Sequence, residues 1–578
     1  MGEIKRKNKK VKVEYDVEDP REVKDKAKTK TKKAYGKISK KNIFRYIFLL
    51  VFEAVFYYFA TPAINIHRPG FWVWLAITLA AICICSLDVT ESQIVELAHN
   101  KKVDGVTPVA KYTFFGAIGC FAVIIIGGIV SSKIFMASKY SNVIEIQEGD
   151  FATDVPESEN VSNIALMDTD SARILGERAI GSLSDVVSQY EVSDDYSTID
   201  YNGVPMKVAP LEYAGFFKYL NNKSSGIPGY VLVDPVKNEA KYVELPKAMN
   251  YSPSAYFGKN LKRHVQMKYP TYEFNGFYFE LDNDGNPYYI CPTLKPNAGL
   301  FGAKDVDKVV ICDPCTGDCS SYDVGEVPTW VDRVYDGQLA CDKFNWYGML
   351  DGGFVNSVIG NKGCKVTTDD FGYKVMDGDV WVYTGVTSVT GDQSNIGFIL
   401  MNSRTAESKY FAIAGAEEHS AMSSAQGQVQ HLGYVASFPS LININGAPTY
   451  IMVMKDNAGL VKMYAMVNVE KYNIVATGAT QKEALTSYRK LLAENGLIDS
   501  GVSVSEETPN KIITVKEIRY ITMDGATYVY ITDTKGEVFK QNFADDETAI
   551  FIEEGSKLKV FYNEEENHIN TIISFEIL

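Results

Sequence analysis

The chain has 578 residues, with 58 Lys and Arg against 72 Asp and Glu, and its net charge is −14. An acidic surface repels phosphates, so we expect no nucleic-acid partner. Neither a G-x-x-x-x-G-K-[ST] phosphate loop nor a G-x-G-x-x-G fingerprint occurs in the sequence, which argues against nucleotide chemistry.

Three apolar runs lie close together near the start of the chain. They cover Tyr46–Ile66, Phe71–Leu87 and Phe114–Ser131, and each is 17 to 21 residues long. At a rise of ~1.5 Å per residue, helices of this length match the ~30 Å hydrocarbon core of a bilayer. We therefore predict a three-helix membrane anchor at residues 43–136.

A basic tail, residues 1–42, precedes the anchor. Residues 1–41 hold 16 Lys and Arg against seven acids, a balance of +9 that leaves −23 for the rest of the chain. Because short basic segments stay in the cytoplasm, we expect the tail to lie inside, mostly disordered and near anionic lipid headgroups. Three spans then deliver residues 137–578 to the outer face, and no cleaved signal peptide is expected.

Glu53 is the one acid inside a predicted span. An intramembrane carboxylate is costly and often functional, so one hypothesis is a proton or ion relay. The favoured interpretation is pairing with Arg45 or with a Tyr hydroxyl near the interface. Glycines of the third run suit close helix packing, within the chain or between copies in an oligomer: Gly116, Gly119, Gly127 and Gly128.

After a linker at 137–168, the region 169–496 carries a repeated pattern. Asn or Asp, Gly, any residue and Pro recur before an apolar strand, at Asn202-Gly203-Val204-Pro205, Asp284-Gly285-Asn286-Pro287 and Asn445-Gly446-Ala447-Pro448. Asp377-Gly378 begins a degenerate fourth copy. Such pairs accept the positive φ of hairpin turns. A second turn follows in each copy, with an Asp or Asn at one place: Asp234, Asp313, Asn402 and Asn468. We predict about four related units.

Helical patterns fall between these strands. An apolar stripe runs from Ala179 to Tyr190, a Ser-capped pattern covers Ser252–Lys268, and a third pattern covers Thr480–Leu492. Each unit is then a helix on one face of an antiparallel sheet. Segregated helices and sheets of this kind predict the α+β class.

The order of strand, DG turn, strand and a closing D-P-x-T-G-[DE] motif resembles PepSY-type modules, which are secreted or membrane-tethered. The best match is Asp313-Pro314-Cys315-Thr316-Gly317-Asp318, followed by Asp234-Pro235. The resemblance implies a binding or peptidase-inhibiting role toward exported proteins and assigns no catalytic residue. The layout also resembles that of uncharacterised multi-pass membrane proteins of Gram-positive bacteria.

A polar linker at 497–509 leads to residues 510–578, which read as four or five strands. Their number and length predict a small β-barrel of OB-like or SH3-like size. OB folds often bind nucleic acids or sugars, but this segment is rich in acids. A structural or protein-binding role is favoured.

Six of the nine cysteines lie outside the predicted spans: Cys291, Cys312, Cys315, Cys319, Cys341 and Cys364. An even number outside the membrane favours disulfides. We expect one bond from Cys312 or Cys315 to Cys319, and another between Cys341 and Cys364. Cys312, Cys315 and Cys319 could instead be three ligands of a zinc site, which needs a fourth. No cofactor is predicted.

Acids, imidazoles and hydroxyls gather around Glu417, His419, Ser420 and His431. A metal site could use Glu417, His419 and His431, and Ser420 or Ser423 could be a nucleophile beside His419. Neither H-E-x-x-H nor G-x-S-x-G is present. On one straight helix the two histidines would lie ~18 Å apart. A capped, solvated helix start is the favoured interpretation.

Together these features predict a membrane-tethered, extracytoplasmic binding or scaffold protein without catalytic activity, in a bacterial plasma membrane. Its expected partners are the lipid bilayer and exported proteins or peptidases. Two competing hypotheses are a membrane-anchored hydrolase or metal-dependent enzyme centred on His419, and an accessory subunit of a transport complex that rests on Glu53.

Overall fold

The computed structural model describes residues 40–87, 107–158, 161, 164–181, 183–389, 394–498, 510–523, 526–543, 547–563 and 569–578. Most of the predicted basic tail, most of the loop between the second and third runs, and the Asp524-Gly525 turn lie outside these residues. The described chain divides into two compact units. One contains Met1–Ala60 and Trp72–Phe121, and the other contains Thr61–Phe71 and Ala122–Leu578.

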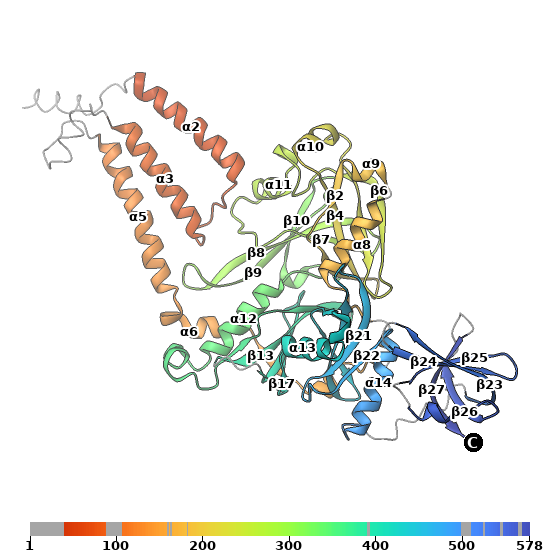
Figure 1. Cartoon of the computed structure of the whole chain (residues 1–578). Helices are drawn as coiled ribbons and strands as arrows, with labels where there is room; N and C mark the ends of the chain where they lie inside the picture. Colours follow the sequence, from red (N-terminus) through yellow and green to blue (C-terminus); the bar gives the residue numbers. More distant parts are fainter. Residues whose placement is uncertain are drawn as a thin grey trace, which may run out of the picture. The chain divides into compact units, whose positions relative to one another are not determined.

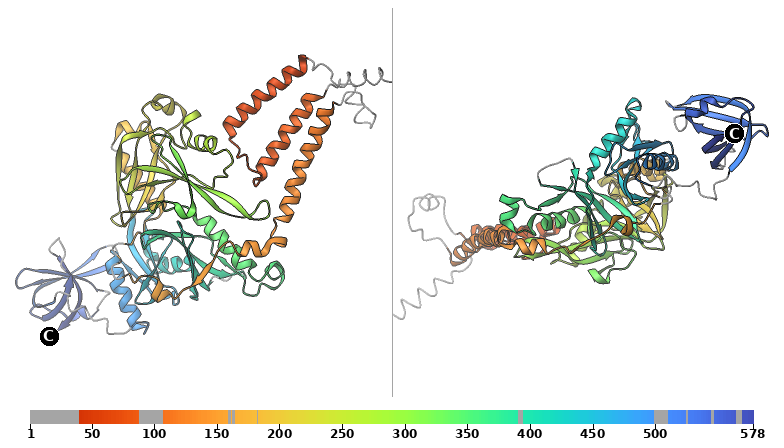
Figure 2. Two further views of the ribbon diagram at one scale, coloured as in Figure 1. Left: turned by 180° about the vertical axis from the view of Figure 1, so that it is seen from behind. Right: turned by 90° about the horizontal axis from the view of Figure 1, so that it is seen from below.

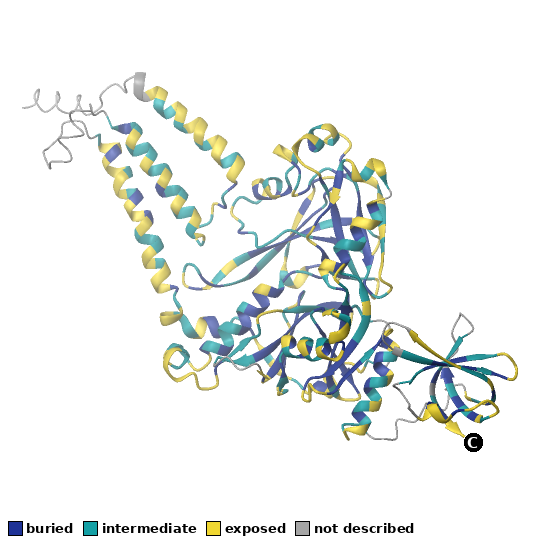
Figure 3. Cartoon of the chain, in the orientation of Figure 1, coloured by how far each residue is buried: buried dark blue, intermediate teal, exposed yellow. Residues whose placement is uncertain are grey.

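Three helices are long and apolar enough to cross a membrane: α2 (Lys40–Ala60), α3 (Pro69–Ser86) and α5 (Pro108–Val130). Most of their side chains are exposed or half-buried (Figure 3), as lipid-facing helices require. The first predicted run extends to Ile66, but α2 ends at Ala60. Thr61 precedes Pro62, and a residue before proline is disfavoured in the helical conformation.

Four consecutive antiparallel sheets follow, each a meander of four strands (Figure 1). Sheet one contains β3 (Ser197–Tyr201), β4 (Val204–Tyr213), β5 (Ile227–Asp234) and β6 (Glu239–Met249), with β2 (Tyr190–Val192) beside β4. Sheet two contains β7 (Tyr278–Leu281), β8 (Pro287–Ala298), β9 (Gly302–Cys312) and β10 (Cys319–Asp323).

The third and fourth sheets repeat this order and add short edge strands. Sheet three contains β12 (Gly372–Met376), β13 (Asp379–Ser388), β15 (Gly397–Asn402) and β16 (Ser408–Phe411), with β11 (Lys365–Thr367) and a parallel β1 (Ile146–Glu148). Sheet four contains β19 (Ser440–Ile444), β20 (Ala447–Lys455), β21 (Val461–Asn468) and β22 (Val475–Gly478), with β18 (Val435–Ala436). β14 (Ser394–Asn395) pairs with β17 (Gly415–Ala416).

The repeated turns occupy corresponding places in these sheets. Asn202-Gly203, Asp377-Gly378 and Asn445-Gly446 join the first two strands of sheets one, three and four, and all six residues have positive φ. Asp284-Gly285 joins β7 to β8 through a longer turn, in which Asp282 Oδ1 accepts the backbone N–H groups of Asp284 and Asn286. The units predicted from the repeat are therefore the four meanders.

The second turn of each unit is closed by the recurring Asp or Asn. Its side-chain Oδ1 accepts one or two backbone N–H groups of the turn that follows, at 2.7–3.2 Å, in all four sheets. The acceptors are Asp234, Asp313, Asn402 and Asn468. Short polar side chains that bond the backbone two or three residues ahead stabilise such turns locally.

Helices connect the sheets and cover them. They are α6 (Lys133–Ser141), α7 (Phe151–Asp154), α8 (Thr169–Gly181), α9 (Ser184–Val187), α10 (Phe216–Asn222), α11 (Leu261–Lys268), α12 (Gly337–Leu350), α13 (Glu418–Gln428) and α14 (Gln481–Glu494). Shorter turns are η2 (Phe257–Lys259), η3 (Val324–Glu326), η4 (Asn356–Gly360), η5 (Gln430–Leu432) and η7 (Glu547–Phe551).

Two of the predicted helices differ from expectation and one agrees. The stripe from Ala179 to Tyr190 is divided between α8 and α9. The pattern over Ser252–Lys268 becomes helical only at Leu261, where the Asn260 side chain caps the Arg263 N–H. Thr480 caps α14 as its position indicates, by accepting the Glu483 N–H at 3.1 Å.

The sheets stack in chain order, and each gap between them is a hydrophobic core. Sheet one packs on sheet two, sheet two packs on α12 and sheet three, sheet three packs on α13 and sheet four, and sheet four packs on α14. α12 therefore lies between two sheets, as Figures 1 and 2 show. An ion pair of 2.8 Å between Lys343 of α12 and Asp305 of β9 fixes it there.

The loop between α2 and α3 is bound to the sheet region. The Ile64 N–H donates to the Pro270 carbonyl at 2.7 Å, and the Asn65 amide donates to the Thr271 carbonyl at 2.9 Å. At the end of α5, Ser131 Oγ accepts the Leu300 N–H, at 2.7 Å, from the β8–β9 hairpin tip. These contacts lie within the second unit, so the loop after α2 and the end of α5 both belong to the folded sheet region.

The predicted linker at 137–168 also contributes structure. It contains β1, which pairs with β16, and α7, which the Asp150 side chain caps through the Thr153 N–H. Farther along, the Ser158 N–H donates to the Asn443 carbonyl at 2.9 Å. Much of this segment is therefore integrated into sheets three and four.

The last strands pair in a closed ring in the order β23-β24-β25-β27-β26. They are β23 (Asn510–Met523), β24 (Ala526–Asp533), β25 (Val538–Asn542), β26 (Lys557–Asn563) and β27 (Ile569–Ile577). Apolar side chains such as Phe539 and Val529 fill the interior. The likeness to an OB or SH3 barrel stays a prediction.

The glycine of a repeated turn gives a test of this fold. Gly446 has a φ of +79°, so Gly446→Ala should destabilise the β19–β20 hairpin by about 1 kcal/mol. Gly427→Ala is the matched control, because Gly427 lies inside α13 with open space around it. That change should stabilise the protein by up to about 1 kcal/mol. Hydrogen exchange of the β20 and α13 amides measures both; equal effects of the two changes would contradict the turn assignment.

Candidate functional site

The first strands of the four sheets lie side by side. β3 contacts both β7 and β12, and Lys374 of β12 donates from Nζ to the Leu441 carbonyl of β19 at 3.2 Å. Where the turns meet, the Asn202 amide donates to the Asn283 carbonyl at 3.0 Å. The repeat therefore brings one corresponding strand of every unit to a common centre.

A cavity of about 470 Å³ opens beside these strands. Its walls come from residues 156–158 and 164–165, from Pro205 at the start of β4, from Lys374–Asp377 and from Ser440. Ligand pockets usually measure ~300–1,000 Å³ and carry a few convergent polar groups. We refer to this cavity as the central pocket.

Three charged side chains line the central pocket: Lys374, Glu157 and Asp377. Burial lowers the pKa of Lys374 to about 8, although the nearby Asp377 carboxylate opposes the shift. Glu157 Oε1 accepts the Asn445 N–H at 3.3 Å, which holds this carboxylate at the rim. The pocket therefore presents a cation and two anions within a small volume.

Two buried carboxylates lie where β3, β7 and the segment before α12 meet. Glu280 of β7 is 0% exposed and Asp332 is 2% exposed. Glu280 accepts the backbone N–H groups of Asp332 and Arg333, both at 2.9 Å, and Asp332 Oδ2 accepts the Asp200 N–H at 2.8 Å. These four residues, which we name the acid junction, join β3, β7 and the segment before α12.

Charge repulsion and burial act together in the acid junction. Burial raises the pKa of Glu280 to about 7, against the opposing hydrogen bonds from Asp332 and Arg333. Burial and the neighbouring Glu280 raise the pKa of Asp332 well above its usual range. The Arg333 guanidinium carbon lies 4.1 Å from the centre of the Tyr278 ring and 5.3 Å from that of Tyr373, which extends the contact to β12.

The predicted histidine site is spread over the surface. His419 and His431 are both exposed, on α13 and η5. Ser420 donates from Oγ to Glu417 Oε1 at 3.5 Å, whereas Glu418 points inward and its Oε1 accepts the Gly385 N–H at 2.7 Å. The structure assembles no shared ligand set from these residues, within the part of the chain that it describes.

Cysteine and histidine meet at the β9–β10 hairpin. Cys312 and Cys319 are directly opposite each other, with their sulfurs 2.7 Å apart. His264 of α11 joins them, so that the three donor atoms lie within 4.8 Å of one another. Cys315 is separate, because its thiol donates to the Lys247 carbonyl at 3.2 Å. The sequence reasoning missed His264, which lies 48 residues before Cys312 in the chain.

This geometry does not fit a zinc ion. Two thiolates on tetrahedral zinc, with Zn–S bonds of ~2.3 Å, lie about 3.8 Å apart, well beyond the 2.7 Å between these sulfurs. The hydrogen bond with Cys312, followed by His264, lowers the pKa of the Cys319 thiol to about 5. The arrangement suits thiol chemistry better than metal binding.

The other cysteines expected in disulfides are also free thiols, and the predicted Cys341–Cys364 bond stays a prediction. All nine cysteines are free thiols in the structure. Cys341 is buried in α12, and Cys364 donates to the Met349 carbonyl at 3.7 Å. Cys291 is buried in β8 and donates to the Tyr289 carbonyl at 3.6 Å.

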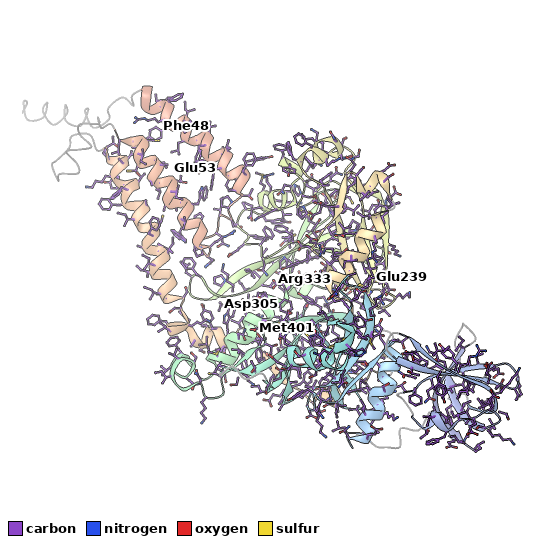
Figure 4. The ribbon with its side chains drawn as sticks, viewed as in Figure 1. Phe48, Glu53, Glu239, Asp305, Arg333 and Met401 are labelled. Atoms are coloured by element: carbon purple, nitrogen blue, oxygen red, sulfur yellow. The ribbon has the colours of Figure 1, made fainter. Side chains whose placement is uncertain are left out.

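Glu53 binds two side chains of the neighbouring helix. Its Oε2 accepts the Trp74 Nε1–H at 3.1 Å and its Oε1 accepts the Thr78 hydroxyl at 2.9 Å; Figure 4 labels the residue. The expected Arg45 partner instead donates to the Leu87 carbonyl. Glu53 thus joins α2 to α3, and Gly116 of α5 lies close to Leu79 of α3.

No family model matches the chain, and no curated protein matches it. Among solved structures, a B. megaterium levansucrase variant is 10% identical, with 77% of this chain and 98% of that chain covered and a TM-score of 0.18. A levansucrase complexed with sucrose and a B. subtilis levansucrase variant are each 8% identical, with 73% and 98% coverage and TM-scores of 0.17 and 0.18. Scores this low establish no shared fold.

The acid junction predicts a pH-dependent stability. Because the folded pKa of each acid is raised, the folded state holds its protons more tightly than the unfolded state. Stability should therefore fall as the pH rises from ~4, the unfolded value, through 7. Asp332→Asn removes one of two repelling charges and keeps an oxygen for the Asp200 N–H. We expect its Tm to exceed that of the wild type by several degrees at pH 8 and by less at pH 5.

Asp194→Asn is the matched control, because the Asp194 side chain is 85% exposed. This variant should shift the Tm little at either pH. Thermal unfolding at both pH values makes the measurement. An equal gain from Asp332→Asn at pH 5 and pH 8 would contradict a buried, repelling pair.

Proposed function

We propose that the chain is a membrane-tethered, extracytoplasmic binding protein without catalytic activity, whose ligand site is the central pocket. The observation that carries this proposal is the pocket itself, where three sheet units and residues 156–158 and 164–165 meet around charges of both signs. The N-terminal tail lies in the cytoplasm and the four sheets lie outside a bacterial plasma membrane.

Anchoring of the sheets supports this arrangement. Three helices are long and apolar enough to span a membrane, and the sheet region binds both the loop after α2 and the end of α5. Any side chain at Gly127 of α5 would collide with the Phe301 ring, 2.7 Å from a Cβ placed there. The loop after α2 and the end of α5 are therefore part of the folded unit that carries the pocket.

The charges of the pocket indicate the chemical class of ligand. Lys374 suits a carboxylate, whereas Glu157 and Asp377 suit an ammonium group. A volume of about 470 Å³ accommodates a few residues. A short peptide with free amino and carboxyl ends carries both an ammonium group and a carboxylate. Exported proteins are a source of such peptides.

Tri-alanine is a direct probe of this site. Titration calorimetry with the full chain in detergent should show binding of tri-alanine and none of its N-acetylated, C-amidated form. A hydrogen bond to a charged group contributes ~1.5–3 kcal/mol, so Lys374→Met should weaken binding by about 10- to 100-fold. Lys482→Met, on the exposed face of α14, is the control and should have no effect. Binding that survives Lys374→Met would overturn the assignment.

The pH dependence of binding should follow the lysine. Because the pKa of Lys374 is lowered to about 8, tri-alanine should bind less tightly as the pH rises through 8, where the amine becomes neutral. The amino end of the peptide also titrates near ~8, so Lys374→Arg is needed as a comparison. Arginine stays charged, and this variant should lose less affinity between pH 7 and pH 9. Identical losses would assign the titration to the peptide alone.

An outer location also predicts a disulfide. Disulfides persist in oxidising compartments, and Cys312 and Cys319 lie opposite each other across one hairpin. In protein isolated from intact cells without reductant and then denatured, reduction should expose two further thiols to a maleimide mass tag. Cys319→Ser should remove that difference, whereas the control Cys341→Ser should not. An unchanged number of tags upon reduction would count against both the bond and the outer location.

A further inference from the structure

Two neighbouring segments of the sheet region form a surface that is both aromatic and basic. They are residues 214–226, which contain α10, and residues 250–271, which contain η2 and α11. Neither segment contains an Asp or Glu, in a chain whose net charge is −14. Together they carry six basic residues: Lys218, Lys223, Lys259, Lys262, Arg263 and Lys268. We name this the basic aromatic surface.

Aromatic rings from the two segments pack together and remain exposed. The Phe216 ring lies 5.0 Å from that of Tyr256 and 6.3 Å from that of Phe257. Phe217 is 76% exposed and Phe257 is 45% exposed. Phe257 also has a φ of +51°, a conformation that is unfavourable for a bulky side chain. These rings therefore contact one another but still present much of their apolar area to the surroundings.

Hydrogen bonds connect this surface to the loop between two apolar helices. Pro270 and Thr271, which accept the Ile64 N–H and the Asn65 amide, follow α11 by only a few residues. The loop that donates these bonds joins the ends of α2 and α3, two helices long and apolar enough to span a bilayer. α11 has eight residues, a length of about 12 Å. The loop between α2 and α3 is therefore bonded to the last two residues of the basic aromatic surface, and α11 leads from there to its rings.

We propose that the basic aromatic surface rests on an anionic lipid bilayer, with Phe217 and Phe257 among the headgroups. Aromatic rings are enriched at the membrane–water interface, and Lys and Arg are attracted to anionic lipids. An acidic protein would otherwise be repelled by such lipids, so a local region without acids is needed for contact. This inference rests on the proposed membrane tethering and adds a second, reversible contact between the sheet region and the lipid.

Lipid quenching of tryptophan fluorescence tests the contact. The full chain is placed in nanodiscs of phosphatidylcholine, with or without phosphatidylglycerol, that contain brominated acyl chains. Phe217→Trp should add emission, most of which is lost to bromine when phosphatidylglycerol is present. Val358→Trp is the matched control, because Val358 of η4 is also exposed, at 61%, and lies in a separate segment. Its added emission should survive.

Charge reversal separates lipid attraction from simple apolar contact. In the Phe217→Trp background, Lys223→Glu with Lys262→Glu should restore the lost emission. Lys482→Glu with Lys535→Glu changes the net charge equally, on α14 and the terminal barrel, and should restore none. Quenching that is equal in the control, or unaffected by reversal at Lys223 and Lys262, would overturn the proposal.

Two further outcomes assign a failure to its cause. Quenching that appears only when two copies share one disc would identify the surface as a contact between copies and overturn the lipid proposal. A chain that does not remain with the disc during purification would overturn the membrane tethering itself. A chain that remains with the disc but keeps the full Phe217→Trp emission would overturn the surface contact alone.

Discussion

The acid junction is the constraint that the centre of the molecule depends on. Glu280 and Asp332 lose nearly all contact with water, and a buried carboxylate is costly unless hydrogen bonds satisfy it. Three backbone N–H groups from two distant parts of the chain satisfy them. β3, β7 and the segment before α12 must therefore approach together. Any displacement of one sheet would leave a buried carboxyl group without its donors, which is more destabilising than the loss of an exposed contact.

Much of the fold could be predicted because its signals are local. A type I′ turn needs residues that accept positive φ, so Asn445-Gly446 and its counterparts mark each first hairpin. The second turn needs an acceptor two or three residues before its N–H groups, which is why Asn468 recurs in register with Asp234. The three apolar helices could be predicted from the length of the apolar runs alone. The order in which the sheets stack was not predicted, because their packing faces share the same apolar residue types.

The site could be predicted much less well. His419 and Glu417 were candidate site residues because reactive residue types lie close together in the sequence there. In the structure they lie at the exposed start of a helix. The groups that do gather come from separate units: Lys374 meets Leu441, and His264 meets Cys319. Their signals were present but weak. Glu280 is an acid between Phe279 and Leu281 in a short apolar strand. An ionisable residue is unusual at such a position, which is the one signal that the sequence offers for the acid junction.

Anchoring and repetition together restrict how such a protein can work. A sheet region joined to apolar helices by the chain alone would share no hydrogen bonds with the segments that connect them. Here the loop after α2 and the end of α5 are both hydrogen-bonded to it, so two separate connecting segments belong to its folded structure. The central pocket is formed by strands of the same stack. The backbone contacts of Pro270 and Leu300 therefore make both connecting segments part of the unit that contains the central pocket.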